Sequence, residues 1–223
     1  MKVSHELLEL RAQVENCELC PRLVGWRQEV ARKKRRAYVD QEYWGKPVPG
    51  FGDPSAELVI VGLAPGAHGA NRTGRIFTGD RSGDWLFAAL HRAGFANQPN
   101  ATDLDDGLVL DNCYITMPVR CVPPQNKPTA EEKNNCAPYL LRELELIKPK
   151  VILCLGAIGF ASVCKTLDMK PRPKFIHSGI HQTKLGITVV NCYHVSQQNT
   201  QTGRLTEEML DDVFASVQGL IEV

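Results

Sequence analysis

The sequence predicts an α/β domain built on a mainly parallel sheet. Four short apolar runs have the length of buried strands, and three of them are rich in β-branched residues. Helical patterns lie between or after these runs, and such alternation is typical of a layered α/β fold. The 223 residues suit one domain with a core large enough to be stable on its own.

The predicted strands are, in chain order, ELVIVG (57–62), NCYITMPV (112–119), VILCLG (151–156) and ITVVNCYHV (187–195). Three of the helical patterns carry a start signal. Ser82 can cap the first helix, and Thr129 with Glu132 forms a T-x-x-E capping box at the second. Thr206 starts the last helix, and no internal repeat or low-complexity segment interrupts this order.

The segment before the first strand reads as an N-terminal helical arm of about 50 residues. It ends in YWGKPVPGFGDP (43–54), a loop rich in proline and glycine. This loop connects the arm to the core without dividing two domains, so we expect residues 1–223 to form a single domain. The arm carries a basic run, RKKRR (32–36), whose usual interpretation is a solvated helix face, with phosphate contact as the alternative.

The composition of the chain limits the classes of protein to which it can belong. The net charge is +1, which gives no global argument for nucleic acid. No apolar stretch approaches the roughly 18 residues that a membrane span needs, and the N-terminus MKVSHELLEL lacks the apolar region of a signal peptide. We therefore expect a cytoplasmic protein that makes no membrane contact, with a monomer as the default state.

Four polar or glycine-containing segments follow the predicted strands, at 62–74, 120–129, 155–159 and 194–204. Ligands of parallel α/β sheets bind beyond the carboxyl ends of the strands, where these segments meet. Three of the four are long and polar, which predicts a binding site at this edge. The alternative is that they are plain connections.

The first of these segments continues as GLAPGAHGANRTGRIFTGD (62–80), with five glycines in nineteen residues. A glycine-rich turn after a strand is typical of a phosphate-binding loop. Here Pro65 stands where the dinucleotide fingerprint G-x-G-x-x-G has no place for it, and the G-K-[ST] of a P-loop is absent. The segment therefore indicates another kind of pocket.

Eight cysteines favour a metal or cluster site, since cytosolic thiols stay reduced. Cys17 and Cys20 form a C-x2-C pair that fits a zinc knuckle, a redox dithiol or half of an iron–sulfur site, and the lack of a preceding strand disfavours the dithiol. Four others lie in the strand runs or on an apolar helix and are expected in the core: Cys113, Cys154, Cys164 and Cys192. Cys121 and Cys136 remain as partners, and both Zn²⁺ and [4Fe–4S] accept four thiolates.

Segment 62–80, RCVPPQNKP (120–128), YHVSQQNTQTGRL (193–205) and the four cysteines together resemble the family 5 uracil-DNA glycosylases, the B-type iron–sulfur enzymes. The resemblance extends from Cys17 to about Leu205. It implies a three-layer α/β fold with a central four-stranded mainly parallel sheet flanked by helices. It also implies that Cys17, Cys20, Cys121 and Cys136 hold a structural [4Fe–4S] cluster, which ties the arm to the core.

The same resemblance implies a monofunctional DNA glycosylase, which flips a damaged base out of the duplex and hydrolyses its N-glycosidic bond. It assigns His194 to the charge on the departing base, Phe77 to stacking on that base and Asp80 to positioning water. The structural alternatives are a buried histidine, a core phenylalanine and a helix-capping carboxylate. Leu63 and Ala64 stand where relatives carry a water-activating side chain, a departure that family 5 shares.

The resemblance also implies further site residues within these segments. The expected base pocket also includes Gly62, Leu63, Ala64, Gly66, Asn126 and Asn199. The expected DNA contacts are Arg72, Arg75, Gln197, Gln198 and Arg204, with 194–205 wedged into the minor groove.

The substrate is expected to be DNA that contains uracil or another deaminated base. Family 4 enzymes read uracil with an asparagine, and Met117 stands at that place here, so hypoxanthine and xanthine are expected to be accepted too. Such an enzyme would perform the first step of base-excision repair. Two alternatives stay open: a non-catalytic nucleic-acid-binding module with a structural zinc or iron–sulfur site, and a redox protein.

Overall fold

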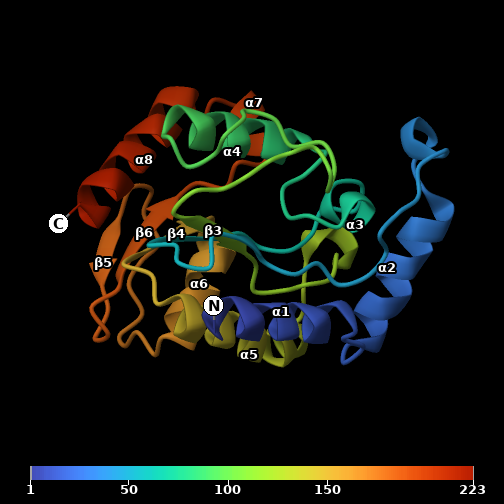
Figure 1. The fold of residues 1–223 in the computed structure, drawn as a ribbon, viewed down its shortest axis with the longest axis horizontal. Coiled ribbons are helices and arrows are strands. Elements are labelled where there is room, and N and C mark those ends of the chain that lie inside the picture. The colour runs from blue at the N-terminus through green and yellow to red at the C-terminus, as the bar shows by residue number, and fades with distance from the viewer. Residues whose placement is uncertain (1, 223) are drawn as a thin grey trace.

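A mixed sheet forms the middle layer of the molecule (Figure 1), which is a computed structural model that describes residues 2–222. The six strands run in the order β1-β3-β2-β4-β6-β5. The inner four pair in parallel: β3 (Cys113–Thr116), β2 (Leu58–Val61), β4 (Val151–Leu155) and β6 (Thr188–Cys192). This confirms the predicted four-stranded parallel centre, with strands shorter than the apolar runs.

Two short antiparallel strands, absent from the prediction, extend the sheet at its edges. They are β1 (Phe51–Gly52) beside β3 and β5 (Ile180–Gln182) beside β6. The first lies inside the segment predicted to be loop throughout. Strands of two and three residues carry no recognisable alternation, and pairing with a longer neighbour is what defines them.

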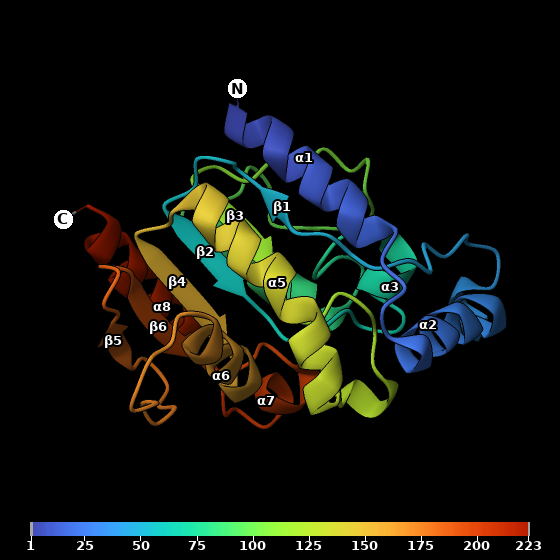
Figure 2. The ribbon, with the colours of Figure 1, turned by 90° about the horizontal axis from the view of Figure 1, so that it is seen from below.

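Helices cover both faces of the sheet. On one face lie α4 (Arg81–Arg92) and α8 (Glu207–Ile221), and on the other lie α1 (Lys2–Glu15), α5 (Ala130–Ile147) and α6 (Ala157–Thr166) (Figures 1 and 2). Leu58 and Ile60 of β2 face the first layer, and Val59 and Val61 face the second, as the period of two requires. No helix within residues 2–222 combines the length and apolar character that crossing a membrane demands.

Three helix starts were predicted, and two are confirmed. The hydroxyl of Thr129 accepts a hydrogen bond from Glu132 N, and the Glu132 side chain accepts one from Thr129 N, so the capping box is complete. Thr206 caps α8 by accepting from Met209 N. The third prediction is wrong, because Asp80 rather than Ser82 caps α4.

The N-terminal arm packs along the core. Helix α1 lies against α5 and buries Leu7 and Leu10, and α2 (Pro21–Lys33) follows it (Figure 2). Arg22 of α2 forms a bidentate ion pair with Glu132, in which both hydrogen bonds are 2.7 Å long. The basic run 32–36 was expected to form one helix face, and this prediction is wrong. Helix α2 ends at Lys33, the backbone breaks at Lys34, and the short 3₁₀ helix η1 (Arg36–Tyr38) follows.

A buried polar network joins β3 and the segment after it to α5. Glu143 of α5 accepts hydrogen bonds from Arg120, from Thr116 and, at 3.2 Å, from the hydroxyl of Tyr114. The side chains of Arg120 and Glu143 are only 1% and 3% exposed. Because an unpaired charge at such a position is costly, this network fixes the segment that leads from β3 to Cys121.

Replacing Glu143 by alanine is expected to lower the free energy of unfolding by about 3–5 kcal/mol, because the Arg120 guanidinium would stay buried without its counter-charge. Chemical denaturation measures the change. Glu145→Ala, at a half-exposed site on the same helix, is the matched control and should change stability by no more than about 0.5 kcal/mol. Equal stability of the two variants would contradict the role of the buried pair.

Candidate active site

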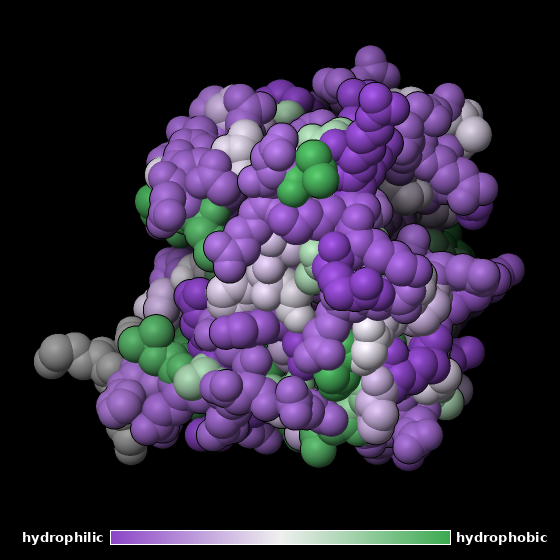
Figure 3. Space-filling model, turned by 90° about the vertical axis from the view of Figure 1, so that its right-hand side faces the viewer, coloured by the Kyte–Doolittle hydropathy of each residue, from purple (hydrophilic) through white to green (hydrophobic). Residues whose placement is uncertain are grey.

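The loops predicted to form a site do meet at the carboxyl edge of the four parallel strands. Segments 62–80 and 117–129 follow β2 and β3, and segments 156–157 and 193–204 follow β4 and β6. The side of the molecule that carries α2 (Pro21–Lys33) and α3 (Ala70–Thr73) is largely hydrophilic, with few hydrophobic residues on it (Figure 3). Such a surface suits contact with a hydrated, charged partner.

Asp80 connects the start of α4 to the glycine-rich turn after β2. Its Oδ1 accepts hydrogen bonds from Ser82 N at 3.0 Å and from Gly83 N at 3.1 Å, at the start of α4. Its Oδ2 lies against Gly66 and Gly69, and a Cβ at Gly69 would overlap the carboxylate. Burial raises the pKa of Asp80 above its ordinary value, although the N–H groups of Gly83 and Ser82 counteract this effect. The side chain is thus both the cap and a carboxylate of the site.

Phe77 adopts an unusual backbone conformation, with φ at +53°. A non-glycine residue pays a steric cost there, so the surrounding packing must hold it. Gly62 allows the Phe77 ring to pack against its main chain, since a Cβ at that position would be 2.9 Å from Phe77 Cζ. A side chain at Gly83 would overlap the carbonyl of Phe77. Gly62 therefore leaves room for the ring, and Gly83 leaves room for the main-chain carbonyl of Phe77.

His194 follows β6 and lies beside Phe77. The two ring centroids are 6.1 Å apart, with 43° between the planes. A Cβ at Gly156 would be 3.2 Å from His194 Cβ, so the end of β4 packs tightly on the histidine. Burial lowers the pKa of His194 to about 4, which leaves the imidazole neutral at physiological pH. A neutral imidazole can donate a hydrogen bond without bringing a full positive charge.

The turn after β2 brings main-chain groups to the same place. Gly62 N donates to Thr116 O at 3.0 Å, which joins the ends of β2 and β3, and Gly66 O accepts from Asn71 N. Leu63 and Ala64 are half-buried, and Ala64 packs against the cysteine cluster described below. Of the pocket residues predicted in this turn, Gly62 lies beside Phe77 and Gly66 lies beside Asp80.

The two predicted asparagine contacts have different positions. Asn199 Nδ2 donates to His194 O at 2.8 Å, so its amide holds the histidine loop. Asn126 lies exposed on the short 3₁₀ helix η2 (Pro124–Asn126), with φ at +57°. The structure does not bring these two side chains together at Phe77.

Two of the predicted DNA-binding arginines are used inside the protein. Arg75 is buried, pairs with Asp106 and donates to Thr78 Oγ1 at 2.9 Å, so a phosphate has no access to it. This corrects the prediction of a phosphate contact for Arg75. Arg72 donates to the carbonyls of His68 and Gly79, at 2.7 Å and 2.8 Å, and its guanidinium lies over the Tyr38 ring.

The loop after His194 exposes its other predicted DNA contacts. Gln197 and Gln198 lie on the outside of the short helix α7 (Gln197–Gln201), which Ser196 caps. Arg204 is exposed and stacks its guanidinium on the Tyr193 ring at 4.7 Å. Their role toward DNA stays a prediction.

The four predicted ligand cysteines converge. Cys20, Cys121 and Cys136 form one buried group with Leu23 and Val119. Burial raises the pKa of Cys121 to about 12; Arg27 opposes this, and the nearby thiols of Cys136, Cys17 and Cys20 add to it. No group of three or more His, Cys, Asp or Glu side chains within residues 2–222 is spaced to hold a single metal ion.

Two pairs of residues at the site were not predicted. Tyr43 OH lies 3.0 Å from His68 Nδ1, which joins the arm to the glycine-rich turn. Tyr193 N donates to His177 Nδ1 at 3.1 Å, and their rings stack at 4.7 Å beside His194. His68 could have been found, since it lies inside segment 62–80. His177 stands in a segment with no recognisable motif.

Comparison with known proteins identifies the family of this chain. The model of the uracil DNA glycosylase superfamily matches residues 49–218. The type-5 uracil-DNA glycosylase of Mycobacterium leprae is 52% identical over 216 residues, or 95% of this chain and 94% of the relative. That of Thermus thermophilus is 47% identical over 206 residues, or 92% and 93%. The chain belongs to the type-5 uracil-DNA glycosylases.

Membership of the type-5 uracil-DNA glycosylases confirms the resemblance inferred from the motifs. The type-4 uracil-DNA glycosylase of Archaeoglobus fulgidus is more distant, at 36% identity over 124 residues, or 55% of each chain. Met117 lies beside Phe77 at the carboxyl edge, since a Cβ at Gly62 would contact both side chains.

Gly69→Ala is expected to lower the free energy of unfolding by about 1–3 kcal/mol, because the new methyl group must displace the Asp80 carboxylate from the cap of α4. Thermal or chemical denaturation measures it. The control is Gly219→Ala, in α8 with open space around it, which should raise stability by up to about 1 kcal/mol. A Gly69→Ala protein as stable as the wild type would show that the turn does not confine Asp80.

Proposed function

We propose that this protein hydrolyses the N-glycosidic bond of uracil, and of other deaminated bases, in DNA. Family membership supports a DNA glycosylase, and the names of the relatives support uracil as a substrate. The observation that carries the proposal is the grouping of an aromatic ring, a neutral imidazole and a confined carboxylate at one sheet edge. Removing the base creates an abasic site, the first step of base-excision repair.

Phe77 would stack on the flipped base. An enzyme that acts on a base must take it out of the helix, and stacking on an aromatic ring compensates part of the lost stacking. The ring packs against Gly62 and is buried in the core cluster, so little entropy is lost when the base arrives. Gln197, Gln198 and Arg204, exposed on the neighbouring loop, would contact the DNA around the extruded base.

His194 would stabilise the departing base. As the C1′–N bond lengthens, negative charge develops on the base and positive charge on the sugar. A neutral imidazole donor aimed at a base carbonyl stabilises that anion, and the low pKa of His194 keeps the ring neutral. Asn199, through its bond to His194 O, would fix the loop that aims the imidazole.

Asp80 would position the attacking water. Its Oδ1 is occupied by the cap of α4, whereas its Oδ2 faces the turn of Gly66 and Gly69. An ionised carboxylate can orient water toward C1′ and offset the positive charge on the sugar. The water oxygen bonds to C1′ as the C1′–N bond breaks, the water gives one proton to the Asp80 carboxylate, and the released base anion takes a proton from solvent. Leu63 and Ala64 carry no group for this task.

The pocket is expected to accept hypoxanthine and xanthine as well as uracil. Met117 is buried and packs in the same cluster as Phe77, so no side-chain amide reads the base at that position. The Asn199 amide nitrogen is engaged by the backbone, and Asn126 is exposed. Without a hydrogen-bonding partner that rejects other bases, discrimination by the pocket is weak.

The four cysteines fit a [4Fe–4S] cluster, which would supply a structural link and no step of the reaction. Two buried guanidinium groups near them keep unpaired N–H groups among the described residues, Nε of Arg27 and Nε and Nη1 of Arg120. A cluster with four thiolates carries net negative charge that these cations would offset. A single zinc ion, with Zn–S bonds of about 2.3 Å, needs closer sulfur atoms than a cluster does. Cys17 and Cys20 would then tie the arm to the turn at Ala64.

Release of uracil from a duplex, followed by alkaline cleavage at the abasic site, tests the function. The single-turnover rate should fall as the pH drops through the raised pKa of Asp80, because protonation removes the group that orients water. Asp80→Asn should abolish this acidic limb and slow base release by roughly 100-fold or more. His194→Ala should slow it by about 100- to 1,000-fold.

Asp84→Asn is the matched control, since Asp84 is an exposed carboxylate in the first turn of the same helix. It should keep the wild-type rate above the acidic limb, and the limb itself should move to lower pH, because the Asp84 charge contributes to the raised pKa of Asp80. No abasic product from the wild-type protein would refute the proposed activity. A wild-type rate with Asp80→Asn would remove Asp80 from the mechanism while leaving the activity intact.

Removing a cluster ligand tests the cofactor. The protein purified without oxygen should contain about four iron atoms per chain and absorb broadly near ~400 nm, and Cys136→Ser should lose both properties. Cys154→Ala, at a buried cysteine within β4, should keep them. A colourless wild-type protein with one zinc ion would contradict the cluster.

A further inference from the structure

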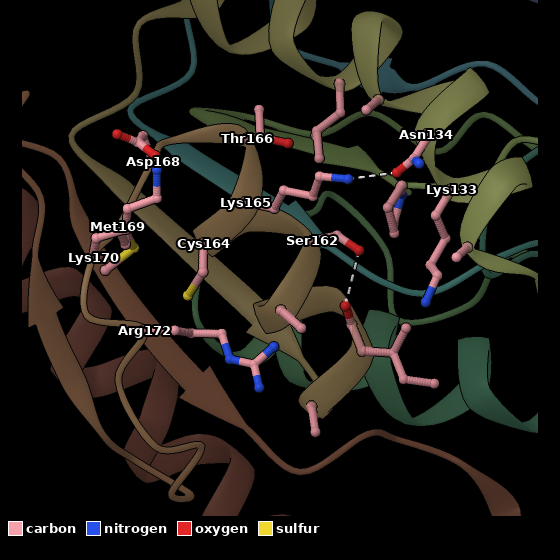
Figure 4. Close-up of a pocket in the computed structure, with 17 residues that line it drawn as sticks. Lys133, Asn134, Ser162, Cys164, Lys165, Thr166, Asp168, Met169, Lys170 and Arg172 are labelled. Carbon is pink, nitrogen blue, oxygen red and sulfur yellow. Dashed lines mark hydrogen bonds and ion pairs between the residues drawn. The ribbon is translucent and has the colours of Figure 1, made fainter.

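A groove lies between α5 and α6, outside the candidate base pocket. It forms a cavity of about 740 Å³ (Figure 4). Its floor is apolar, with Ala137 and Leu140 from α5 and Ala161 from α6. Cavities of this size are typical of sites that enclose a ligand. Nothing in the proposed reaction uses this groove.

The rim of the groove is cationic. It includes Lys133, Lys165, Lys170 and Arg172 and only one carboxylate, Asp168. Asp168 is paired with Lys170 at 2.6 Å. Lys133, Lys165 and Arg172 have no carboxylate partner among residues 2–222, although Lys165 donates to the Asn134 amide oxygen. Figure 4 shows Lys133 on one side of the groove and Arg172 on the other.

The groove begins at the edge where the candidate base pocket lies. Pro118 and Ala157 line it, and they follow the ends of β3 and β4. Ala157 is the neighbour of Gly156, which packs on His194. This end of the groove therefore lies at the same sheet edge as His194, and a DNA strand bound there would meet the three unpaired positive charges of the rim as it extends along the groove.

We propose that the α5–α6 groove is a second DNA-binding site, which holds backbone phosphates of the strand that leaves the base pocket. Lys133 and Arg172 contact the phosphates from the two sides of the groove, and the apolar floor lies under the sugars. This inference rests on the proposed function, since it takes DNA as the substrate. It also explains how a chain of net charge +1 binds a polyanion: the charge is concentrated locally, where Arg75 contributes none.

The test is the salt dependence of DNA affinity, measured by fluorescence anisotropy. The probe is a labelled duplex that carries a tetrahydrofuran analogue of an abasic site. In Lys133→Ala/Arg172→Ala, the slope of log K against log salt between about 50 and 200 mM should become shallower by about 1.8, or 0.9 for each lost phosphate contact. At about 0.1 M salt the affinity should fall by roughly tenfold.

Lys148→Asn/Lys150→Ala is the charge-matched control, with both positions outside the groove lining and before the start of β4, at the opposite edge of the sheet. It should keep the wild-type slope, and circular dichroism should show that both variants are folded. If the groove variant has the same slope of log K against log salt as the control, the proposal is overturned. The cationic rim would then bind an acidic peptide or a small anion instead of DNA. Absence of uracil release by the wild-type protein would instead refute the proposed function, so the two failures are distinguishable.

Discussion

The hydrogen bonds from Ser82 N and Gly83 N to the Asp80 carboxylate are the constraint on which the candidate site depends. They start α4, and they fix Asp80 where the glycine-rich turn closes over its second oxygen. Because the cap uses one oxygen and the turn confines the other, the side chain has little freedom. One carboxylate therefore connects the local folding of segment 62–80 to the chemistry proposed for it.

Glycine spacing explains why the rest of the pocket can assemble around this cap. Gly62 and Gly83 admit the Phe77 ring and carbonyl, and Gly156 admits His194. Each position needs close approach more than backbone freedom, and only Gly156 of the three has a positive φ. The motif thus resembles a phosphate loop in composition, while its glycines make room for side chains of the site instead of phosphates.

Local patterns predicted much of this structure. Apolar runs located all four inner strands, and T-x-x-E located the start of α5. Elimination among eight cysteines found the four that converge. Local patterns could not predict pairs of residues that are distant in the sequence. Arg75 pairs with Asp106, 31 positions away, so the residue predicted to contact phosphate forms a buried ion pair instead. The α5–α6 groove was missed for the same reason, since its cations come from separate segments with no motif.

The central claim is that the carboxyl edge of the sheet, organised by Asp80, receives the flipped base. A crystal structure of the Asp80→Asn protein bound to a uracil-containing duplex tests it most directly. The account predicts that the uracil ring stacks on Phe77, with a base carbonyl within hydrogen-bond distance of His194. A base still stacked in the duplex, or bound in the α5–α6 groove, would contradict it.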